Sequence, residues 1–316
     1  MPSRNTAGAR APRVSLLGSL AALVVLLAMA APAGAATHEL WIAAVPVNWD
    51  IVPNGHDAIM NTPVDQERRH LRTVVYREYT RGFGRALHPG PPPQDRGIVG
   101  PLIRGRVGDR FVVHFLNKDT LFKRPHSMHF HGVHYAFGSD GSFIPGFSGP
   151  GASVMPGRRF TYRFTAGADS KGVWPYHDHS PSMDTSIQGG LYGALSIAGR
   201  GERRPDHEFV VFLGAMGGFE TIDGRAFVGN TPVFHARLGQ TVQWDVLNLG
   251  DEFHTFHVHG HRWQRADGTS EDTRTIGPAE SFAVRWKEDR RGTWLYHCHV
   301  ESHMMMGMIG IYRVTA

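Results

Sequence analysis

Histidines in this chain are gathered into four short windows. Of the 20 histidines, 13 lie in the 27 residues of windows 126–134, 177–179, 254–261 and 297–303. The windows hold four His-x-His units, namely His129/His131, His177/His179, His257/His259 and His297/His299. On a β-strand residues i and i+2 point to the same face, so each unit presents two imidazoles side by side. Eight neutral imidazoles suit cations such as copper or zinc, and they are enough for two or three ions.

The single cysteine, Cys298, lies between two of these histidines. Because its neighbours face one way on a strand, its thiol faces the other way and belongs to a second metal site. His303 and Met308 follow it, and His254 comes from the other end of the same repeat unit. A thiolate, two imidazoles and a weak thioether form the ligand set of a blue copper site. Met304–Met306 compete with Met308 for the axial position.

Alternating apolar and polar residues indicate the elements that position these side chains. Period-two patterns run over 160–164, 242–246 and 282–286, and Gly/Pro/Asp/Asn turns separate them. Such patterns predict half-buried antiparallel strands. No long helical period is visible beyond the first 35 residues. The fold class is therefore predicted to be all-β, built from β-sandwiches.

The chain also carries an internal repeat. Three segments match later ones in the same order: 107–117 with 238–248, 126–135 with 254–263, and 173–179 with 293–299. We therefore expect two related domains, 37–199 and 205–316, joined by the polar stretch GRGERRPDHE.

The N-terminal segment, residues 1–35, is predicted to be a signal peptide. Arg4, Arg10 and Arg13 precede an apolar run over 14–30, and Ala-Gly-Ala follows as a small-residue cleavage site. A membrane anchor is the alternative. Cleavage would lower the net charge from +5 to +2. The mature protein is then expected to be secreted or periplasmic, without stable membrane insertion. No Lys/Arg stripe is visible, so nucleic acid is not an expected partner.

Four motifs resemble the copper-binding motifs of multicopper oxidases. They are HSMHFHG, WPYHDH, HTFHVHG and YHCHVESHMMMGM, and they stand in the order of that family. The likeness is greatest to two-domain bacterial enzymes called small laccases. YREYTRGF and GIVGPLIRGRVGDRFVVHF are also similar to ceruloplasmin-type domains. The resemblance implies two cupredoxin-like Greek-key β-sandwich domains and four coppers per chain.

The resemblance also implies ligands for each copper. The type 1 copper would be held by Cys298, His254, His303 and Met308. The type 2 copper would be held by His129 and His257. The type 3 pair would be held by His131, His177, His179, His259, His297 and His299. In two-domain enzymes of this kind the three-copper cluster lies between neighbouring subunits, so a homotrimer is implied.

Two further residues are candidates for the chemistry of oxygen reduction. Asp140, in a Ser-Asp-Gly turn, is the candidate proton donor or relay, and Tyr135 is expected near the type 2 copper. Both match positions noted in small laccases, although Asp140 also suits a turn and Tyr135 could simply pack. Asp178, between two ligand histidines, is expected to support their hydrogen bonds.

The first domain lacks the residues of a complete type 1 site. The repeat places Asp178 opposite Cys298, Met183 opposite His303, and His126 opposite His254. A blue copper is therefore expected only in the second domain. This counts against copper nitrite reductase, whose type 1 cysteine lies in its first domain.

The predicted function is a copper oxidase with O2 as acceptor and a small reducing substrate. It would take single electrons from phenols or aromatic amines at the type 1 copper and reduce oxygen to water at the cluster. Glu301 and Met304–Met306 lie close to His303 in sequence, so a Cu(I) or Fe(II) oxidase is the alternative. The sequence alone does not show where Glu271 and Asp272 lie relative to these sites, so it assigns them to neither function. A secreted copper-storage protein is a third possibility, but storage does not need the His-Cys-His unit. A zinc protein also stays open, because imidazoles suit zinc as well.

Overall fold

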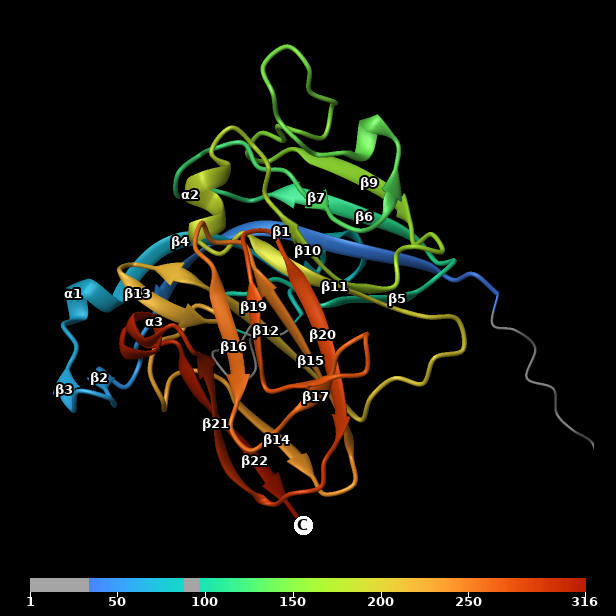
Figure 1. Ribbon diagram of the computed structural model, residues 1–316. Helices are drawn as coiled ribbons and strands as arrows, with labels where there is room; N and C mark the ends of the chain where they lie inside the picture. Colours follow the sequence, from blue (N-terminus) through green and yellow to red (C-terminus); the bar gives the residue numbers. More distant parts are fainter. Residues whose placement is uncertain (1–33, 88–96) are drawn as a thin grey trace, which may run out of the picture. The chain divides into compact units, whose positions relative to one another are not determined.

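Strands form four principal sheets, in two pairs that follow one another along the chain (Figure 1). The structure, a computed structural model, describes residues 34–87 and 97–316. The all-β prediction is confirmed. The predicted signal peptide lies outside the described residues, apart from its last two positions. In the described part of the chain, no helix has both the length and the apolar character needed to cross a membrane.

The first pair of sheets holds the first two His-x-His units. One sheet has the strand order β4-β1-β6-β9-β8 and the other β5-β11-β10-β7. Buried aromatic and aliphatic side chains, Phe111, Tyr162 and Leu195 among them, fill the space between the two sheets. The strands are β1 (Thr37–Asp50), β4 (His70–Tyr79), β5 (Ile103–Arg106), β6 (Arg110–Asn117), β7 (His129–Phe130), β8 (His134–Tyr135), β9 (Arg159–Thr165), β10 (Gly172–His177) and β11 (Tyr192–Ala198).

The second pair holds the remaining units and Cys298. Its sheets have the orders β13-β12-β15-β20 and β14-β22-β21-β16-β19. Trp244, Tyr296 and Tyr312 are fully buried between them, beside Cys298. The strands are β12 (His207–Met216), β13 (Phe219–Ile222), β14 (Val233–Arg237), β15 (Thr241–Asn248), β16 (His254–Val258), β19 (Thr273–Ile276), β20 (Ser281–Lys287), β21 (Gly292–Cys298) and β22 (Ile309–Thr315).

The sequence repeat corresponds to a repeat of structure. β6 and β15 run parallel to the first long strand of their half, β1 or β12, and antiparallel to β9 or β20. β10 and β21 each end on a His-x-His unit and are followed by a short helix, α2 (Met183–Gln188) or α3 (Glu301–Met305). The predicted alternating segments lie within β9, β15 and β20.

Short elements complete the two halves. They are the hairpins β2 (His56–Asp57) with β3 (Thr62–Pro63) and β17 (Trp263–Gln264) with β18 (Ser270–Glu271), the helix α1 (Gln66–Arg69), and the 3-10 turns η1 (Arg81–Phe83) and η2 (Phe137–Ser139).

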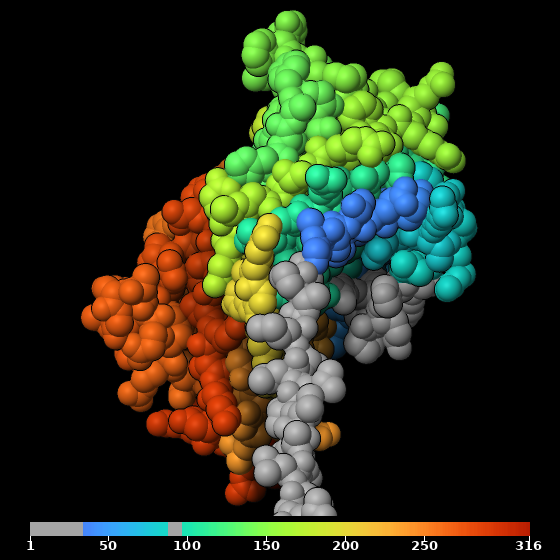
Figure 2. All heavy atoms as spheres, turned by 90° about the vertical axis from the view of Figure 1, so that its right-hand side faces the viewer, coloured from blue at the N-terminus to red at the C-terminus, as the bar shows by residue number. Residues whose placement is uncertain are grey.

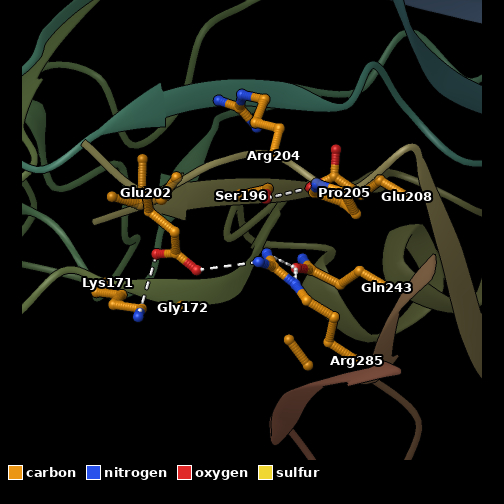
Figure 3. A pocket seen from close by; sticks show the side chains of 12 residues that line it. Lys171, Gly172, Ser196, Glu202, Arg204, Pro205, Glu208, Gln243 and Arg285 are labelled. Atoms are coloured by element: carbon orange, nitrogen blue, oxygen red, sulfur yellow. Dashed lines mark hydrogen bonds and ion pairs between the residues drawn. The ribbon is translucent and has the colours of Figure 1, made fainter. Parts of the chain in front are cut away.

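A third apolar core joins the two halves, so residues 34–316 form one compact unit. Trp49 and Tyr192 of the first half pack there with Phe212 of the second. Beside this core, Arg104 donates to Glu208 at 2.5 Å across the join. Glu202, on the connecting stretch, pairs with Lys171 and Arg285 (Figure 3). The two sheet pairs share this core. The division into domains 37–199 and 205–316 stays a prediction.

Candidate metal centres

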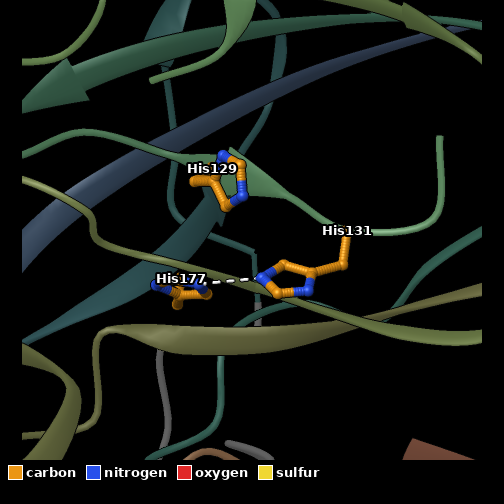
Figure 4. Close-up of side chains that lie close together, drawn as sticks. All are labelled: His129, His131 and His177. Carbon is orange, nitrogen blue, oxygen red and sulfur yellow. Dashed lines mark hydrogen bonds between the residues drawn. The ribbon is translucent and has the colours of Figure 1, made fainter. Parts of the chain in front are cut away.

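The first two His-x-His units form one cluster of imidazoles, here called the first quartet: His129, His131, His177 and His179. β7 and β10 are hydrogen-bonded neighbours, and their register sets His129 directly opposite His177. The Nε2 atoms of His131 and His177 are 3.1 Å apart (Figure 4). The ring of His179 lies 5.4 Å from that of His129 and 5.6 Å from that of His177. One pair of neighbouring strands thus supplies the quartet, and the imidazoles from both strands point toward one another.

Backbone carbonyls orient the rings of this quartet. Nδ1 of His129 donates to the carbonyl oxygen of Asp140 at 2.7 Å, and Nδ1 of His177 donates to that of Asp178 at 2.9 Å. The turn at Asp140 requires glycine next, because a Cβ at Gly141 would lie 2.1 Å from the carbonyl oxygen of Met128. Each donated Nδ1–H leaves the Nε2 lone pair free for a cation, which is how metal-binding histidines are usually held.

The other two units form the second quartet: His257, His259, His297 and His299. β16 and β21 set His257 opposite His297, and the Nε2 atoms of His259 and His297 are 3.1 Å apart. Nδ1 of His257 donates to the carbonyl oxygen of Asp272 at 2.7 Å, with the Thr273 hydroxyl 3.0 Å away. The two quartets therefore repeat the same geometry. Asp272 is the structural counterpart of Asp140, although the loop before it is longer and the repeat offset does not align the two residues.

Burial favours the neutral form of several of these imidazoles. Together with nearby imidazoles, burial lowers the pKa of His131 to about 4 and, against the raising effect of the hydrogen bond to Asp178, lowers that of His177 to about 3. In the second quartet, burial lowers the pKa of His297 to about 4. Neutral imidazoles with converging Nε2 atoms are the form that copper requires. The donor sets fit the copper ions that the sequence implies.

A third cluster matches the predicted type 1 ligand set. The Nδ1 atoms of His254 and His303 are 3.0 Å apart, and Sγ of Cys298 lies 3.8 Å from each. The three atoms form a nearly isosceles triangle, which suits the trigonal His2Cys arrangement of a blue copper site. Burial lowers the pKa of His254 to about 4. The residues present therefore fit a type 1 copper.

Surrounding groups adapt this site to a thiolate. The backbone amides of Thr255 and Val300 donate to Sγ of Cys298 at 3.3 Å and 3.5 Å. Burial raises the pKa of the thiol, while these two donors act in the opposite direction. Met308 is fully buried in the same core and its carbonyl accepts the amide of Cys298, whereas Met306 is exposed. Met308 is therefore placed better than Met306 for the axial position.

The two candidate residues for proton transfer lie beside the first quartet. An oxygen of the Asp140 carboxylate is 3.6 Å from Nδ1 of His129. The ring of Tyr135 lies 6.0 Å from that of His129. Burial, together with the charge and hydrogen bond of Asp140, raises the pKa of Tyr135 to about 12. Tyr135 therefore keeps its proton at neutral pH and donates a hydrogen bond to the carboxylate of Asp140.

Two carboxylates that the sequence did not single out lie at the outer side of the type 1 cluster. Nε2 of His303 donates to Glu252 at 2.9 Å. Glu252, Glu220 and His303 each offer a ligand atom, and these atoms lie within 4.8 Å of one another. Glu301, which sequence proximity favoured, is not in this group. No spacing signal could have found Glu220, because it arrives from β13, far from His303 in sequence.

Within the described ranges, each quartet is a separate group. Ring contacts join the four imidazoles within each quartet, and none joins an imidazole of one quartet to one of the other. The possible metal-binding groups likewise divide into His129/His131/His177 and His257/His259/His297. A single chain therefore presents two separate groups of imidazoles.

Models of the multicopper oxidase family match residues 94–202 and 202–316. A probable nitrite reductase-hydroxylamine oxidoreductase fusion protein of Kuenenia stuttgartiensis is 34% identical over 241 residues, which cover 69% of this chain and 27% of that protein. Ferroxidase HEPHL1 of Homo sapiens is 25% identical over 360 residues, which cover 92% and 30%. The chain therefore spans less than a third of the length of these relatives.

Solved structures share the fold. A crystal structure of a multicopper oxidase superposes with a TM-score of 0.68 at 23% identity, covering 88% of this chain and 89% of that one. The copper nitrite reductase of Nitrosomonas europaea gives 0.65 at 19% identity, covering 88% and 94%. At such identities the likeness shows a cupredoxin-like fold alone. The two matched family models decide the assignment: this chain belongs to the multicopper oxidase family.

Proposed function

We propose that this enzyme oxidises ferrous iron at His303 and reduces oxygen to water at a copper cluster built from both quartets. The overall reaction is 4 Fe²⁺ + O2 + 4 H⁺ → 4 Fe³⁺ + 2 H2O. The observation that carries the proposal is the pair of carboxylates at the outer edge of His303. When bound, copper supplies the couple that accepts single electrons and delivers four to oxygen.

Glu220 has a carboxylate oxygen that is available to bind a cation. Its side chain is buried, and its Oε2 has no hydrogen-bond partner among the described residues. A buried carboxylate oxygen without a partner is costly, and a cation would remove that cost. Burial raises the pKa of Glu220, and the charge of His303 opposes this while that of Glu252 adds to it. A divalent cation between the two carboxylates would reverse the shift.

The chemistry of the carboxylates selects among the possible donors. Carboxylates are hard ligands, which favour Fe(II), whereas Cu(I) prefers thioethers and thiolates. A phenol or aromatic amine could use one carboxylate as a proton acceptor, whereas a metal ion can use both carboxylates as ligands. The expected donor is therefore the metal ion. The relative named ferroxidase HEPHL1, similar over most of this chain, is consistent with that choice.

The chain provides a short route for electrons from His303 to the second quartet. Nδ1 of His303 faces the thiol of Cys298, and Nε2 faces the iron-binding carboxylates. Cys298 is covalently continuous with His297 and His299, which belong to the second quartet. Asp140, with Tyr135 behind it, would hold and pass protons toward the first quartet.

Further parts of the proposal rest on the family resemblance. We propose four coppers per chain: one type 1, one type 2 on His129 and His257, and a type 3 pair on the other six imidazoles. The separate quartets support clusters that are shared between subunits. That the subunits form a homotrimer rests on the resemblance. Cleavage of residues 1–35 and a secreted or periplasmic location complete the proposal.

The test is steady-state oxidation of Fe(II) and of a phenol by Glu220→Gln and Glu252→Gln variants of the copper-loaded enzyme. We expect KM for Fe(II) to rise at least about tenfold, because each variant removes a charged ligand. Oxidation of 2,6-dimethoxyphenol should change less than about twofold. Glu301→Gln is the matched control, an exposed carboxylate on α3. Equal loss with both substrates, or none with iron, would refute iron binding at this site.

A further inference from the structure

His261 is a buried histidine that lies close to the second quartet without being one of its four imidazoles. It follows His259 by two residues, after a turn at Gly260, whose φ of +71° belongs to the region that favours glycine. The side chain of His261 is 3% exposed. The rings of Trp286 and Tyr312 lie 5.4 Å and 5.5 Å from its ring. A polar side chain buried in this way requires hydrogen-bond partners.

Both ring nitrogens of His261 have such partners. Nδ1 donates to the carbonyl oxygen of His259 at 2.7 Å, and Nε2 lies 3.1 Å from a carboxylate oxygen of Glu288. The carboxylate of Glu288 is fully buried, and it also accepts from the indole of Trp286 and the hydroxyl of Tyr312. The imidazole of His261 is therefore held at both nitrogens, and it ties the backbone of His259 to the core of the second half.

The first half has apolar residues where the second half has His261 and Glu288. The matched segments HFHGVH and HVHGHR set Val133 opposite His261. Ala166 corresponds to Glu288, because their amides donate to the carbonyls of matching residues of the repeat. Val133 and Ala166 pack in the core of the first half, and their side chains have no hydrogen-bonding atoms. The shared fold therefore does not require the polar pair, so the pair needs another explanation.

The matching ligands of the two quartets differ in exposure. His259 is exposed, so few side chains of its own chain hold its ring in place. His131, its counterpart, is half-buried and faces a cavity that Trp174 and Phe282 also line. Nε2 of each nevertheless lies 3.1 Å from Nε2 of a neighbouring imidazole of its quartet. The more exposed ligand is the one whose backbone is held by a buried imidazole.

We infer that His261 is a positioning residue for the second quartet. Its Nδ1–H fixes the carbonyl of His259, and Glu288 fixes the imidazole of His261, so that the exposed ring of His259 stays in place for copper. Groups that orient a metal ligand contribute about tenfold to a hundredfold to metal affinity. The inference rests on the part of the proposed function that assigns copper to the second quartet, and it is independent of iron as the substrate.

Two substitutions separate the two hydrogen bonds of His261. In His261→Asn the side-chain amide can replace Nδ1 as the donor to the carbonyl of His259, but it is too short to reach Glu288. In His261→Gln the longer side chain can replace Nε2 at Glu288, but it leaves that carbonyl without its donor. The measurement is the copper retained per chain after the loaded enzyme is dialysed against a graded series of chelator concentrations. Urea unfolding of the copper-free variants shows whether both fold.

His261→Gln should release the copper of the cluster at a chelator concentration at least about tenfold lower than the wild type requires. His261→Asn should stay within about threefold of the wild type. Val133→Ala, at the matching position of the first half, is the control and should retain copper like the wild type. The visible absorption of the type 1 site should persist in all variants, because its ligands make no hydrogen bond with His261 within the described residues.

The order of the two variants decides the outcome. If Asn released copper more readily than Gln, His261 would act only as a partner for Glu288, and the inference would be overturned. Equal retention in the two variants, at any level, would also overturn it, because the Nδ1 hydrogen bond would then contribute nothing. No electron donor takes part in this test. A failure of iron oxidation would therefore refute the proposed substrate and leave the copper result unchanged.

Discussion

The carboxylate of Asp178 stands at the same point of the fold as the thiol of Cys298. Each lies between two ligand histidines at the end of a corresponding strand, β10 or β21. Asp178 is fully buried and accepts from Nδ1 of His126 at 3.1 Å, and from the amide of Ser127 at 2.7 Å. Nε2 of His126 donates to Asp119 at 3.2 Å. Hydrogen bonds in the first half therefore occupy the place that a metal is expected to fill in the second.

Replacing Asp178 by Asn should destabilise the copper-free protein. Burial acts to raise the pKa of Asp178, but hydrogen bonds from His126 and Ser127 hold it below its ordinary value. The carboxylate is therefore charged in the fold. Removing its charge leaves a buried imidazole with one carboxylate in place of two, at a cost of about 3 kcal/mol. Urea unfolding would measure this, with the exposed Asp169→Asn as control. Equal midpoints for the two variants would contradict the prediction.

Cys298→Ser should abolish the visible absorption of the copper-loaded enzyme and lower its copper content by one ion. Oxygen uptake with Fe(II) should cease, because the thiol is the proposed entry point for electrons. The two quartets do not include this thiol, so the remaining copper should stay bound. Met308→Leu should shift the reduction potential of the type 1 site, while Met306→Leu, at an exposed position, should not. Retained oxidase activity in the serine variant would rule out electron entry at Cys298.

Asp140→Asn should slow reoxidation of the reduced enzyme by oxygen while leaving its reduction by Fe(II) unchanged. Its carboxylate interacts with both Tyr135 and His129, so it is placed to pass protons. Loss of general acid catalysis costs about a hundredfold or more. Stopped-flow mixing would measure both half-reactions. Asp272→Asn keeps the carbonyl that holds His257 and should have the smaller effect. A slower reduction step in Asp140→Asn would argue for a role in donor binding.

Asp223 should make the unfolding free energy fall as pH rises. Burial raises the pKa of Asp223 to about 7, and the amide of Phe212 acts in the opposite direction. The folded state then holds a proton that the unfolded chain releases from about pH 4. The associated stability is fully present below that pH and is lost as pH rises through about 7, by roughly 1.4 kcal/mol per unit between these limits.

Asp223→Asn removes the titrating group, and Asn tolerates the positive φ of this residue. Denaturant unfolding of the copper-free variant at pH 5 and pH 7.5 should therefore show a smaller pH difference than the wild type. The amide should keep the hydrogen bond from Phe212. An unchanged difference would assign the pH dependence to other groups.

Features of the site that depend on a single strand or on the internal repeat can be predicted from the sequence. The alternation of strands places His297 and His299 on one face and Cys298 on the other, so three neighbouring residues indicate two sites. The repeat foretold the parallel roles of β10 and β21. Glu220 and Glu252 were out of reach, because β13 and the loop after β15 meet His303 only in the folded chain. Proximity in sequence favoured Glu301 instead. On a short helix, however, a residue two positions from His303 can point its side chain away from the site.

The pattern of apolar residues in the sequence also did not predict the core that the two halves share. Trp49 and Phe212 read as ordinary buried positions of separate sheets, and nothing in their spacing shows that they pack together. The apolar side chains of segment 136–149, in the green lobe at the top of Figures 1 and 2, were equally uninformative. Phe137 and Phe147 resemble core residues in sequence, and only their exposure in the fold separates them from the core.

The division of the imidazoles into two quartets has a consequence for inheritance. In a ring that shares its clusters, a chain defective in the first quartet and a chain defective in the second are each inactive alone. Mixed in one ring, they create a junction at which an intact first quartet meets an intact second quartet. Two recessive lesions in one gene would thus complement each other when expressed together, whereas two lesions in the same quartet would not.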